Sequence, residues 1–343
     1  MIVKESEGIS ELKERLTVQS KIVITTHQNP DGDALGSMLA LYWFFRNQGF
    51  DVTAISPNDY PEFLFWLPGN DIVIDFYKNR KKCEQIINEA NFLFLVDYND
   101  TRRAAEMKDS IDAAQCCKVM IDHHPFPQMI VDYSFSFTEV SSTSELIYEF
   151  IMAMDGHAWM NKSVAECIYT GIMTDTGCFS YNSSRPRTFE IVADLLNYSI
   201  EKDVIYSRIY DSYSAHRMRL LGYCLGQKMQ VFPEYNTALI SLSLDEQKLY
   251  NFVSGDTEGF VNYPLSIKGI CFTAMFIENK DKVKISFRSR GSFPVNALSE
   301  KYFSGGGHTN AAGGESRLSL DETVKKFVDL LPQYAQQLNE NMR

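Results

Sequence analysis

The most informative part of this chain is residues 22–33, which have the sequence Ile22-Val23-Ile24-Thr25-Thr26-His27-Gln28-Asn29-Pro30-Asp31-Gly32-Asp33. The first five residues have the apolar, β-branched character of a buried strand. From residue 34 to 48 apolar residues recur at helical spacing, and Gly49 is placed to end that helix. A histidine and two aspartates therefore lie on one short loop between a strand and a helix. Pro30 restricts the backbone of this loop and Gly32 allows it to turn tightly.

Three further clusters of acidic residues and histidines follow in the first half of the chain. Asp97 closes the apolar run 92–96, and Asp122-His123-His124 closes the run 119–121. Asp175 lies in the segment 171–177, which reads Gly-Ile-Met-Thr-Asp-Thr-Gly. Ligands of an open α/β sheet bind at the carboxyl ends of its strands. Side chains that are far apart in sequence can therefore converge on one pocket.

The order of expected elements indicates an α/β fold with two parts. In the first part, strand-like and helix-like segments alternate, which is typical of a doubly wound, mainly parallel sheet. We expect strands over 22–26, 51–55, 92–96 and 118–121, and helices over 34–48, 78–90, 142–154, 162–173 and 186–198. Ser142 or Thr143 is a plausible N-cap for the helix over 142–154.

After about residue 212 the pattern changes to that of a smaller α/β domain. We expect strands over 237–242, 267–277 and 283–289, a glycine-rich loop at Gly305-Gly306-Gly307-His308 and a final helix over 321–341. The expected division is a metal-binding domain over 1–212, a connecting helix over 213–228 and a substrate-binding domain over 229–343. A cleft between the two domains would hold the active site.

Composition and charge exclude several classes of protein. With 343 residues, 45% hydrophobic and 22% charged, the chain is an ordinary globular protein large enough for two domains. No apolar run approaches the roughly 20 residues that cross a bilayer, and the N-terminus has no signal-peptide core. Seven cysteines without a paired spacing indicate reduced thiols and a cytoplasmic location. A net charge of -11 argues against tight binding to long nucleic acid.

The residue types in the four clusters indicate a centre with two divalent cations. Carboxylates suit Mg²⁺ or Mn²⁺, and imidazole ligands favour Mn²⁺ or a later transition metal. Asp31 and Asp33 could address different ions, Asp97 could bridge both, and His123 with Asp175 would complete the second site. Each residue alone has an ordinary structural explanation, such as a cap or turn residue. The joint pattern is harder to explain in that way, because four of the six histidines belong to these motifs or to the glycine-rich loop.

The same motifs resemble those of the DHH phosphoesterase superfamily. The resemblance rests on His27-x-x-Pro30-Asp31-Gly32-Asp33, Asp97, Asp122-His123-His124 and Asp175. Phe287-Arg288-Ser289-Arg290 and the segment 305–314 resemble the accessory DHHA1 domain, so the resemblance extends from about residue 20 to 340. It is closest to the subgroup of bifunctional oligoribonucleases (nanoRNases) and 3′-phosphoadenosine 5′-phosphate (pAp) phosphatases.

This resemblance implies a role for each candidate residue. His27, Asp31 and Asp97 would hold a first Mn²⁺, and Asp33, Asp97, His123 and Asp175 a second. Asp97, His123 and His124 would be catalytic, with His124 facing the substrate phosphate. Gly305, Gly306, Gly307, His308 and Arg288 would bind substrate, although a glycine triplet alone is usually only a turn. As alternate residues of an expected strand, Arg288 and Arg290 are interpreted as pointing to opposite faces, and the resemblance favours Arg288 as the one that binds.

The expected activity is hydrolysis of short RNA of two to five nucleotides to 5′-mononucleotides, together with dephosphorylation of pAp. Three other enzymes of the superfamily remain open: a pyrophosphatase or exopolyphosphatase, a phosphodiesterase of linear pApA, and a RecJ-like single-strand exonuclease. A non-enzymatic nucleotide sensor is the alternative from another class, although the intact ligand set argues against it. Short RNA or a small nucleotide is the expected partner, without membrane or long duplex, and the family analogy allows a homodimer.

Overall fold

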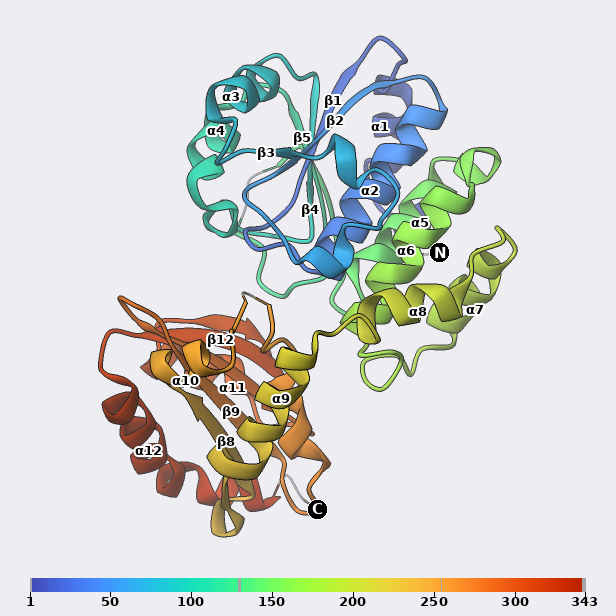
Figure 1. Ribbon diagram of the computed structural model, residues 1–343. Helices are drawn as coiled ribbons and strands as arrows, with labels where there is room; N and C mark the ends of the chain where they lie inside the picture. The colour runs from blue at the N-terminus through green and yellow to red at the C-terminus, as the bar shows by residue number, and fades with distance from the viewer. Residues whose placement is uncertain (1, 129–130, 254, 341–343) are drawn as a thin grey trace. The chain divides into compact units, whose positions relative to one another are not determined.

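The computed structural model describes residues 2–128, 131–253 and 255–340, which form two compact units, Met1–Ser212 and Tyr213–Arg343. The first unit contains a six-stranded sheet in the order β3-β2-β1-β4-β5-β6, and every pair of neighbouring strands is parallel (Figure 1). Its strands are β1 (Lys21–Thr25), β2 (Asp51–Ser56), β3 (Ile74–Asp75), β4 (Phe92–Val96), β5 (Cys117–Asp122) and β6 (Tyr133–Ser136). The predicted doubly wound α/β fold is confirmed.

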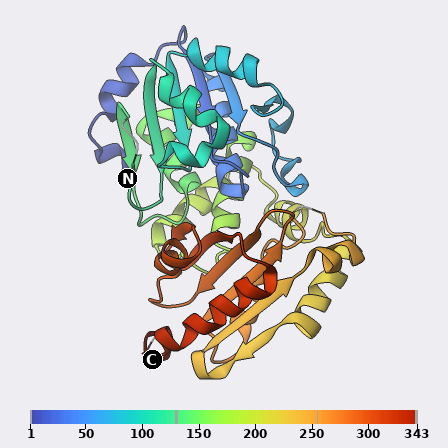
Figure 2. The same cartoon turned by 90° about the vertical axis from the view of Figure 1, so that its left-hand side faces the viewer.

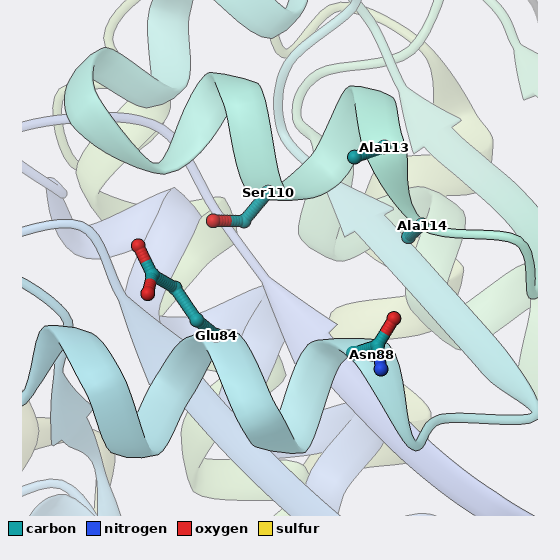
Figure 3. A pocket seen from close by; sticks show the side chains of 5 residues that line it. All are labelled: Glu84, Asn88, Ser110, Ala113 and Ala114. Atoms are coloured by element: carbon teal, nitrogen blue, oxygen red, sulfur yellow. The ribbon is translucent and has the colours of Figure 1, made fainter.

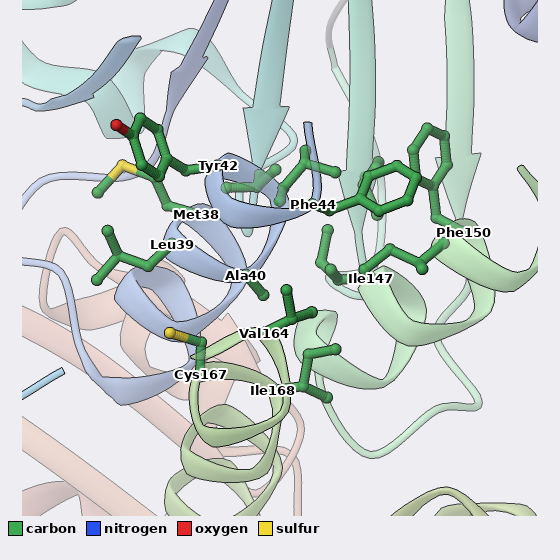
Figure 4. Close-up of a cluster of buried hydrophobic side chains, with 14 of the residues drawn as sticks. Met38, Leu39, Ala40, Tyr42, Phe44, Ile147, Phe150, Val164, Cys167 and Ile168 are labelled. Carbon is green, nitrogen blue, oxygen red and sulfur yellow. The ribbon is translucent and has the colours of Figure 1, made fainter. Parts of the chain in front are cut away.

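Helices cover both faces of this sheet because its strand residues alternate between two apolar layers. The helices of the unit are α1 (Ile9–Arg15), α2 (Gly32–Asn47), α3 (Arg80–Asn88), α4 (Lys108–Ala113), α5 (Thr143–Ala153), α6 (Lys162–Asp175), α7 (Pro186–Leu196) and α8 (Lys202–Tyr210). On one face, Phe92 and Phe94 belong to one apolar cluster with residues of α2, α5 and α6. Figure 4 shows part of this cluster, with Phe44 of α2, Phe150 of α5 and Ile168 of α6. On the other, Leu93 and Leu95 pack against α3 and α4. Burial on both faces explains why these strands read as continuous apolar runs.

Helices α2 and α6 pack closely through two facing glycines. A Cβ on Gly36 would lie 2.6 Å from the carbonyl oxygen of Cys167 and 3.4 Å from the Cα of Gly171. The approach leaves no room for a side chain at either glycine. Since α2 begins at Gly32 and α6 ends at Asp175, this contact also fixes the distance between two parts of the candidate site.

The second unit has its own six-stranded sheet, in the order β11-β12-β10-β9-β8-β7. Its strands are β7 (Gln230–Phe232), β8 (Thr237–Leu242), β9 (Phe272–Glu278), β10 (Val283–Ser289), β11 (Gly306–His308) and β12 (Ala311–Ser316), and its helices are α9 (Ala215–Tyr223), α10 (Leu244–Leu249), α11 (Val295–Tyr302) and α12 (Leu320–Glu340). Helix α12 packs on one face of the sheet (Figure 2). Its Phe327 meets a cluster of strand phenylalanines there. Leu220 and Leu221 of α9 pack on the other face.

Some predicted boundaries in this unit were wrong. The strand expected over 267–277 begins at Phe272, because Gly269 has a φ of 89° and the preceding segment Phe260–Ser266 is a 3₁₀ helix. The glycine-rich segment is not a free loop, since Gly306–His308 forms an edge strand paired with β12. The final helix ends at Glu340, and residue 341 of the prediction lies outside the described residues. None of the helices in the described residues has the length and apolarity needed to span a membrane.

Candidate metal centre

The strand order gathers the predicted ligands at one edge of the first sheet. Strands β1 and β4 are neighbours at the centre, where the order of connections reverses and where doubly wound sheets bind their ligands. His27 follows β1, Asp97 follows β4, and Asp122 is the last residue of β5. The carboxyl ends of three adjacent strands thus contribute side chains to one place.

The first group consists of His27, Asp31 and Asp97, which offer ligand atoms within 4.8 Å of one another. His27 Nδ1 lies 2.8 Å from the carbonyl oxygen of Gln28, which assigns its proton to Nδ1 and leaves Nε2 as the donor to a metal. That Nε2 lies 3.2 Å from Asp97 Oδ2. Asp31 is the N-cap of α2, and its Oδ1 accepts hydrogen bonds from the backbone N–H groups of Asp33 and Ala34, both at 3.0 Å.

The second group consists of Asp33, His123 and Asp175, whose ligand atoms also lie within 4.8 Å of one another. His123 Nε2 is 3.9 Å from Asp33 Oδ2, 3.6 Å from Asp175 Oδ2 and 3.7 Å from Asp97 Oδ1. Asp97 therefore presents Oδ2 to the histidine of the first group and Oδ1 to that of the second. This is the arrangement that a carboxylate bridging two cations requires.

Asp122 has a different role from the other aspartates. Its Oδ2 accepts a hydrogen bond from the backbone N–H of His124 at 2.9 Å, and its Oδ1 lies 2.8 Å from His124 Nδ1. Both carboxylate oxygens are thus used to orient one imidazole. Burial, followed by the charge of Asp97, raises the pKa of Asp122 to about 8.

Electrostatics show that the cluster suits bound cations. Burial raises the pKa of Asp33 well above its ordinary value, and the charges of Asp97, Asp175 and Asp31 raise it further. Burial also opposes ionisation of Asp97, but the hydrogen bond from His27 and the nearby histidines outweigh it and lower that pKa. Carboxylates packed this closely repel one another unless positive charge lies between them. The oxygen and imidazole donors therefore fit hard or borderline divalent metals.

The N-terminus of α5 holds two of these carboxylates in place, which the sequence did not reveal. The backbone N–H groups of Thr143 and Ser144 donate to Asp33 Oδ2 and Oδ1, at 2.7 and 2.8 Å. The Thr143 hydroxyl donates to Asp97 Oδ1 at 2.8 Å. Ser142 was a suggested N-cap, and its hydroxyl does accept from the N–H of Glu145. Only the tertiary fold brings this helix end, about 110 residues away in sequence, to Asp33.

Backbone features around the ligands are those of a constrained site. Asp97 has a left-handed φ of 63°, although its N–H still donates to the Ile121 carbonyl at 3.0 Å. Gly32 does not provide the tight turn that we expected, because it is the first residue of α2 and has no left-handed φ. A Cβ there would instead lie 2.7 Å from Thr174 Cγ2 of α6. Glycine is therefore required by packing rather than by backbone conformation.

The candidate substrate-binding residues of the second unit form one row of its sheet. Arg288 on β10 and His308 on β11 both pair in register with Ala311 of β12, so they lie on one face about 10 Å apart. Our interpretation of Arg288 and Arg290 was wrong, because positions two apart on a strand share a face. Strand β10 also ends at Ser289, before Arg290.

The three glycines before His308 differ in what their surroundings permit. A Cβ on Gly305 would lie 2.5 Å from the Cα of Gly314, and Gly307 has a φ of 139°. By contrast, a Cβ on Gly306 would find its nearest atom 3.7 Å away. Packing and backbone conformation therefore explain Gly305 and Gly307, and only Gly306 is open to a ligand.

A cavity elsewhere in the first unit is unrelated to the cluster. It has a volume of about 190 Å³ and lies between α3 and α4, lined by Glu84, Asn88, Ser110, Ala113 and Ala114 (Figure 3). None of its residues belongs to the groups described above. We therefore assign the chemistry to the buried polar cluster.

Comparison with known proteins identifies the family. Residues 21–172 match the family model described as the N-terminal domain of the DHH family, and residues 246–337 match the DHHA1 domain. The chain therefore belongs to the DHH phosphoesterase family and carries the DHHA1 domain as well. It is accordingly an enzyme that hydrolyses phosphate esters.

Three relatives illustrate the range of this similarity. The bifunctional oligoribonuclease and PAP phosphatase NrnA of Bacillus subtilis is 28% identical, over 94% of this chain and 97% of that one. The crystal structure of an exopolyphosphatase-related protein from Bacteroides fragilis is 43% identical, with a TM-score of 0.92 and 96% of each chain covered. RecJ of Thermus thermophilus in complex with Mn²⁺ is 14% identical with a TM-score of 0.55, covers 96% of this chain but only 54% of its own, and supports the fold alone.

The buried acids predict a pH dependence of stability in the metal-free protein. An acid whose pKa is raised by folding stabilises the protein below its unfolded pKa, and this contribution is lost as pH rises through the folded pKa. Folding raises the pKa values of Asp33, Asp122 and His27, so these three groups make the protein less stable as pH rises from 5 to 8. Folding lowers the pKa of His123, which has the opposite effect on stability. With EDTA, we expect the thermal midpoint to fall by about 5 °C or more over this range. Scanning fluorimetry with saturating Mn²⁺ provides the control and should remove the decline. A flat midpoint in EDTA would contradict the prediction.

Thr143 provides a test of carboxylate positioning. Thr143→Val removes the hydroxyl that donates to Asp97 but keeps the backbone N–H that donates to Asp33. We expect Mn²⁺ affinity, measured by calorimetry, to fall about 10-fold, because hydrogen bonds to metal ligands support metal affinity. Thr143→Ser keeps the hydroxyl and should bind Mn²⁺ nearly as the parent does. Equal affinities for the two variants would show that the hydroxyl is unimportant.

Proposed function

We propose that this enzyme uses two divalent cations, with Mn²⁺ as the proposed metal, to hydrolyse short oligoribonucleotides to 5′-mononucleotides and to dephosphorylate pAp. The proposal of two cations is supported by the position of Asp97, which has one carboxylate oxygen toward His27 and the other toward His123. The substrate class is supported by the similarity to NrnA over nearly the whole of both chains. The net charge of -11 further favours a small phosphorylated substrate over long nucleic acid.

The roles of the side chains follow from their contacts. His27, Asp31 and Asp97 would hold the first cation, and Asp33, Asp97, His123 and Asp175 the second. When bound, such a pair of cations lowers the pKa of water and offsets the charge that develops on a phosphoryl group. Asp122 keeps the His124 ring oriented, and His124 would contact the substrate phosphate.

The second unit would supply the other substrate contacts. Arg288 and His308 share one face of its sheet, and both are suited to a phosphate that is not being cleaved. Gly306 leaves its backbone accessible beside them. All seven cysteines are free thiols, which is consistent with the proposed cytoplasmic location.

One alternative deserves a direct test because of a specific similarity. The relative with 43% identity is described as exopolyphosphatase-related, and phosphoanhydride hydrolysis uses the same chemistry at phosphorus. A panel of substrates with Mn²⁺ distinguishes the two activities: pAp, a diribonucleotide, a pentaribonucleotide, linear pApA, long single-stranded DNA, pyrophosphate and polyphosphate. We expect the highest kcat/KM on the short ribonucleotides and pAp. Faster phosphate release from pyrophosphate or polyphosphate, or preference for long DNA, would overturn the proposed substrate.

A further inference from the structure

Arg103 is a half-buried cation beside the metal centre that the sequence motifs do not include. It lies in the 3₁₀ segment Thr101–Met107, which follows β4. Among the described residues, no hydrogen bond or ion pair involves its guanidinium group. Its guanidinium N–H groups are therefore available to a ligand.

The backbone fixes this arginine against the loop that carries the predicted ligands. Its carbonyl oxygen accepts a hydrogen bond from the N–H of Gln28 at 2.7 Å, and Gln28 follows His27 directly. Its own N–H donates to the Asp100 carbonyl at 2.9 Å. Two residues later, Ala105 has a φ of 49° and a ψ of -126°, a strained conformation that only a well-packed surrounding maintains.

Arg103 is close to the cluster along the chain as well as through the Gln28 hydrogen bond. Its segment Thr101–Met107 begins four residues after Asp97, the residue that follows β4. A positive charge close to these ligands weakens cation binding, so it does not serve the metals. It does favour an anion that approaches them.

We propose that Arg103 binds a non-bridging oxygen of the phosphoryl group that is cleaved. This inference rests on the proposed hydrolysis of phosphate esters. Guanidinium groups suit the purpose because their N–H groups match phosphate oxygens and remain charged at every relevant pH. Held in place before the substrate arrives, the group stabilises the charge that develops on the phosphoryl oxygens during attack.

The neighbouring Arg102 supplies a matched control. Its side chain is 76% exposed, and it forms an ion pair with Asp100, to which its Nε donates at 2.7 Å. Arg102→Ala therefore removes the same charge one position away, without removing a guanidinium next to the cluster. Any effect of lost net charge or of local helix propensity should appear in both variants.

The experiment compares Arg103→Ala, Arg103→Lys and Arg102→Ala in the Mn²⁺-loaded enzyme. For Arg103→Ala we expect kcat/KM for a diribonucleotide to fall about 10- to 100-fold relative to Arg102→Ala. Calorimetry should show weaker binding of inorganic phosphate, while Mn²⁺ affinity stays equal or increases. Arg103→Lys should be intermediate, since it keeps the charge but not the fork of donors.

Two results would overturn the inference. One is a kcat/KM of Arg103→Ala within about 2-fold of Arg102→Ala, with unchanged phosphate affinity. The other is weakened Mn²⁺ binding in Arg103→Ala, which would show that the residue supports the metal loop instead. Failure of the proposed function looks different, because the parent enzyme itself would then hydrolyse none of the phosphate esters. Binding of inorganic phosphate would still distinguish Arg103→Ala from the parent in that case.

Discussion

Asp97→Ala is expected to lower the rate of ester hydrolysis by about 10³-fold or more, because one substitution removes a ligand from both cation positions. In the structure, Asp97 is the only residue that faces both His27 and His123 among the described ligand groups. Its lowered pKa means that it is ionised throughout the physiological range. Calorimetry should therefore show fewer than two Mn²⁺ ions bound per chain at concentrations that saturate the parent.

Asp109→Ala is a suitable control for this variant, because Asp109 is an exposed acid on α4 away from both ligand groups. It should keep full activity and the parent's metal stoichiometry. Circular dichroism and the thermal midpoint in EDTA will establish that Asp97→Ala is folded. Mn²⁺-dependent turnover by a folded Asp97→Ala enzyme would refute the bridging role.

Gly171→Ala is expected to disrupt the centre from a distance, through the packing of two helices. The added Cβ would lie 2.6 Å from Ser144 Cβ and 2.8 Å from Asp33 Oδ1. Because neither the α5 N-terminus nor the Asp33 carboxylate can shift without losing their mutual hydrogen bonds, we expect destabilisation of about 3 kcal/mol. We also expect Mn²⁺ to raise the thermal midpoint much less than in the parent.

The control for this variant is Gly222→Ala on α9, where a Cβ would meet no atom within 4 Å. That change should be neutral or slightly stabilising, since alanine favours a helix over glycine. Urea unfolding with and without Mn²⁺ measures both quantities. Parent-like stability and metal response in Gly171→Ala would show that the helix contact has more tolerance than its geometry indicates.

The sequence was informative about the centre because the relevant signals are local. Asp97 directly follows one apolar strand, and Asp122-His123-His124 stands at the end of another. Each motif therefore predicts both a ligand side chain and its position at the sheet edge. Thr143, Ser144 and Arg103 were not found, because their relation to the cluster depends on tertiary contacts without a local signature. Similarly, the strand over 267–277 was placed too early because its apolar pattern continues through a 3₁₀ segment and a turn.

The paired ends of α2 and α6 make the two cation positions electrostatically unequal. Asp31 of the first group and Asp33 of the second both lie at the N-terminus of α2, whose positive end offsets their charge. Asp175 is the last residue of α6, where the helix dipole adds to its negative charge instead of balancing it. The strongest attraction for a cation should therefore come from the α6 end of the second group. We therefore expect the two cations to bind stepwise, with the ion held by Asp175 binding before the ion of the first group.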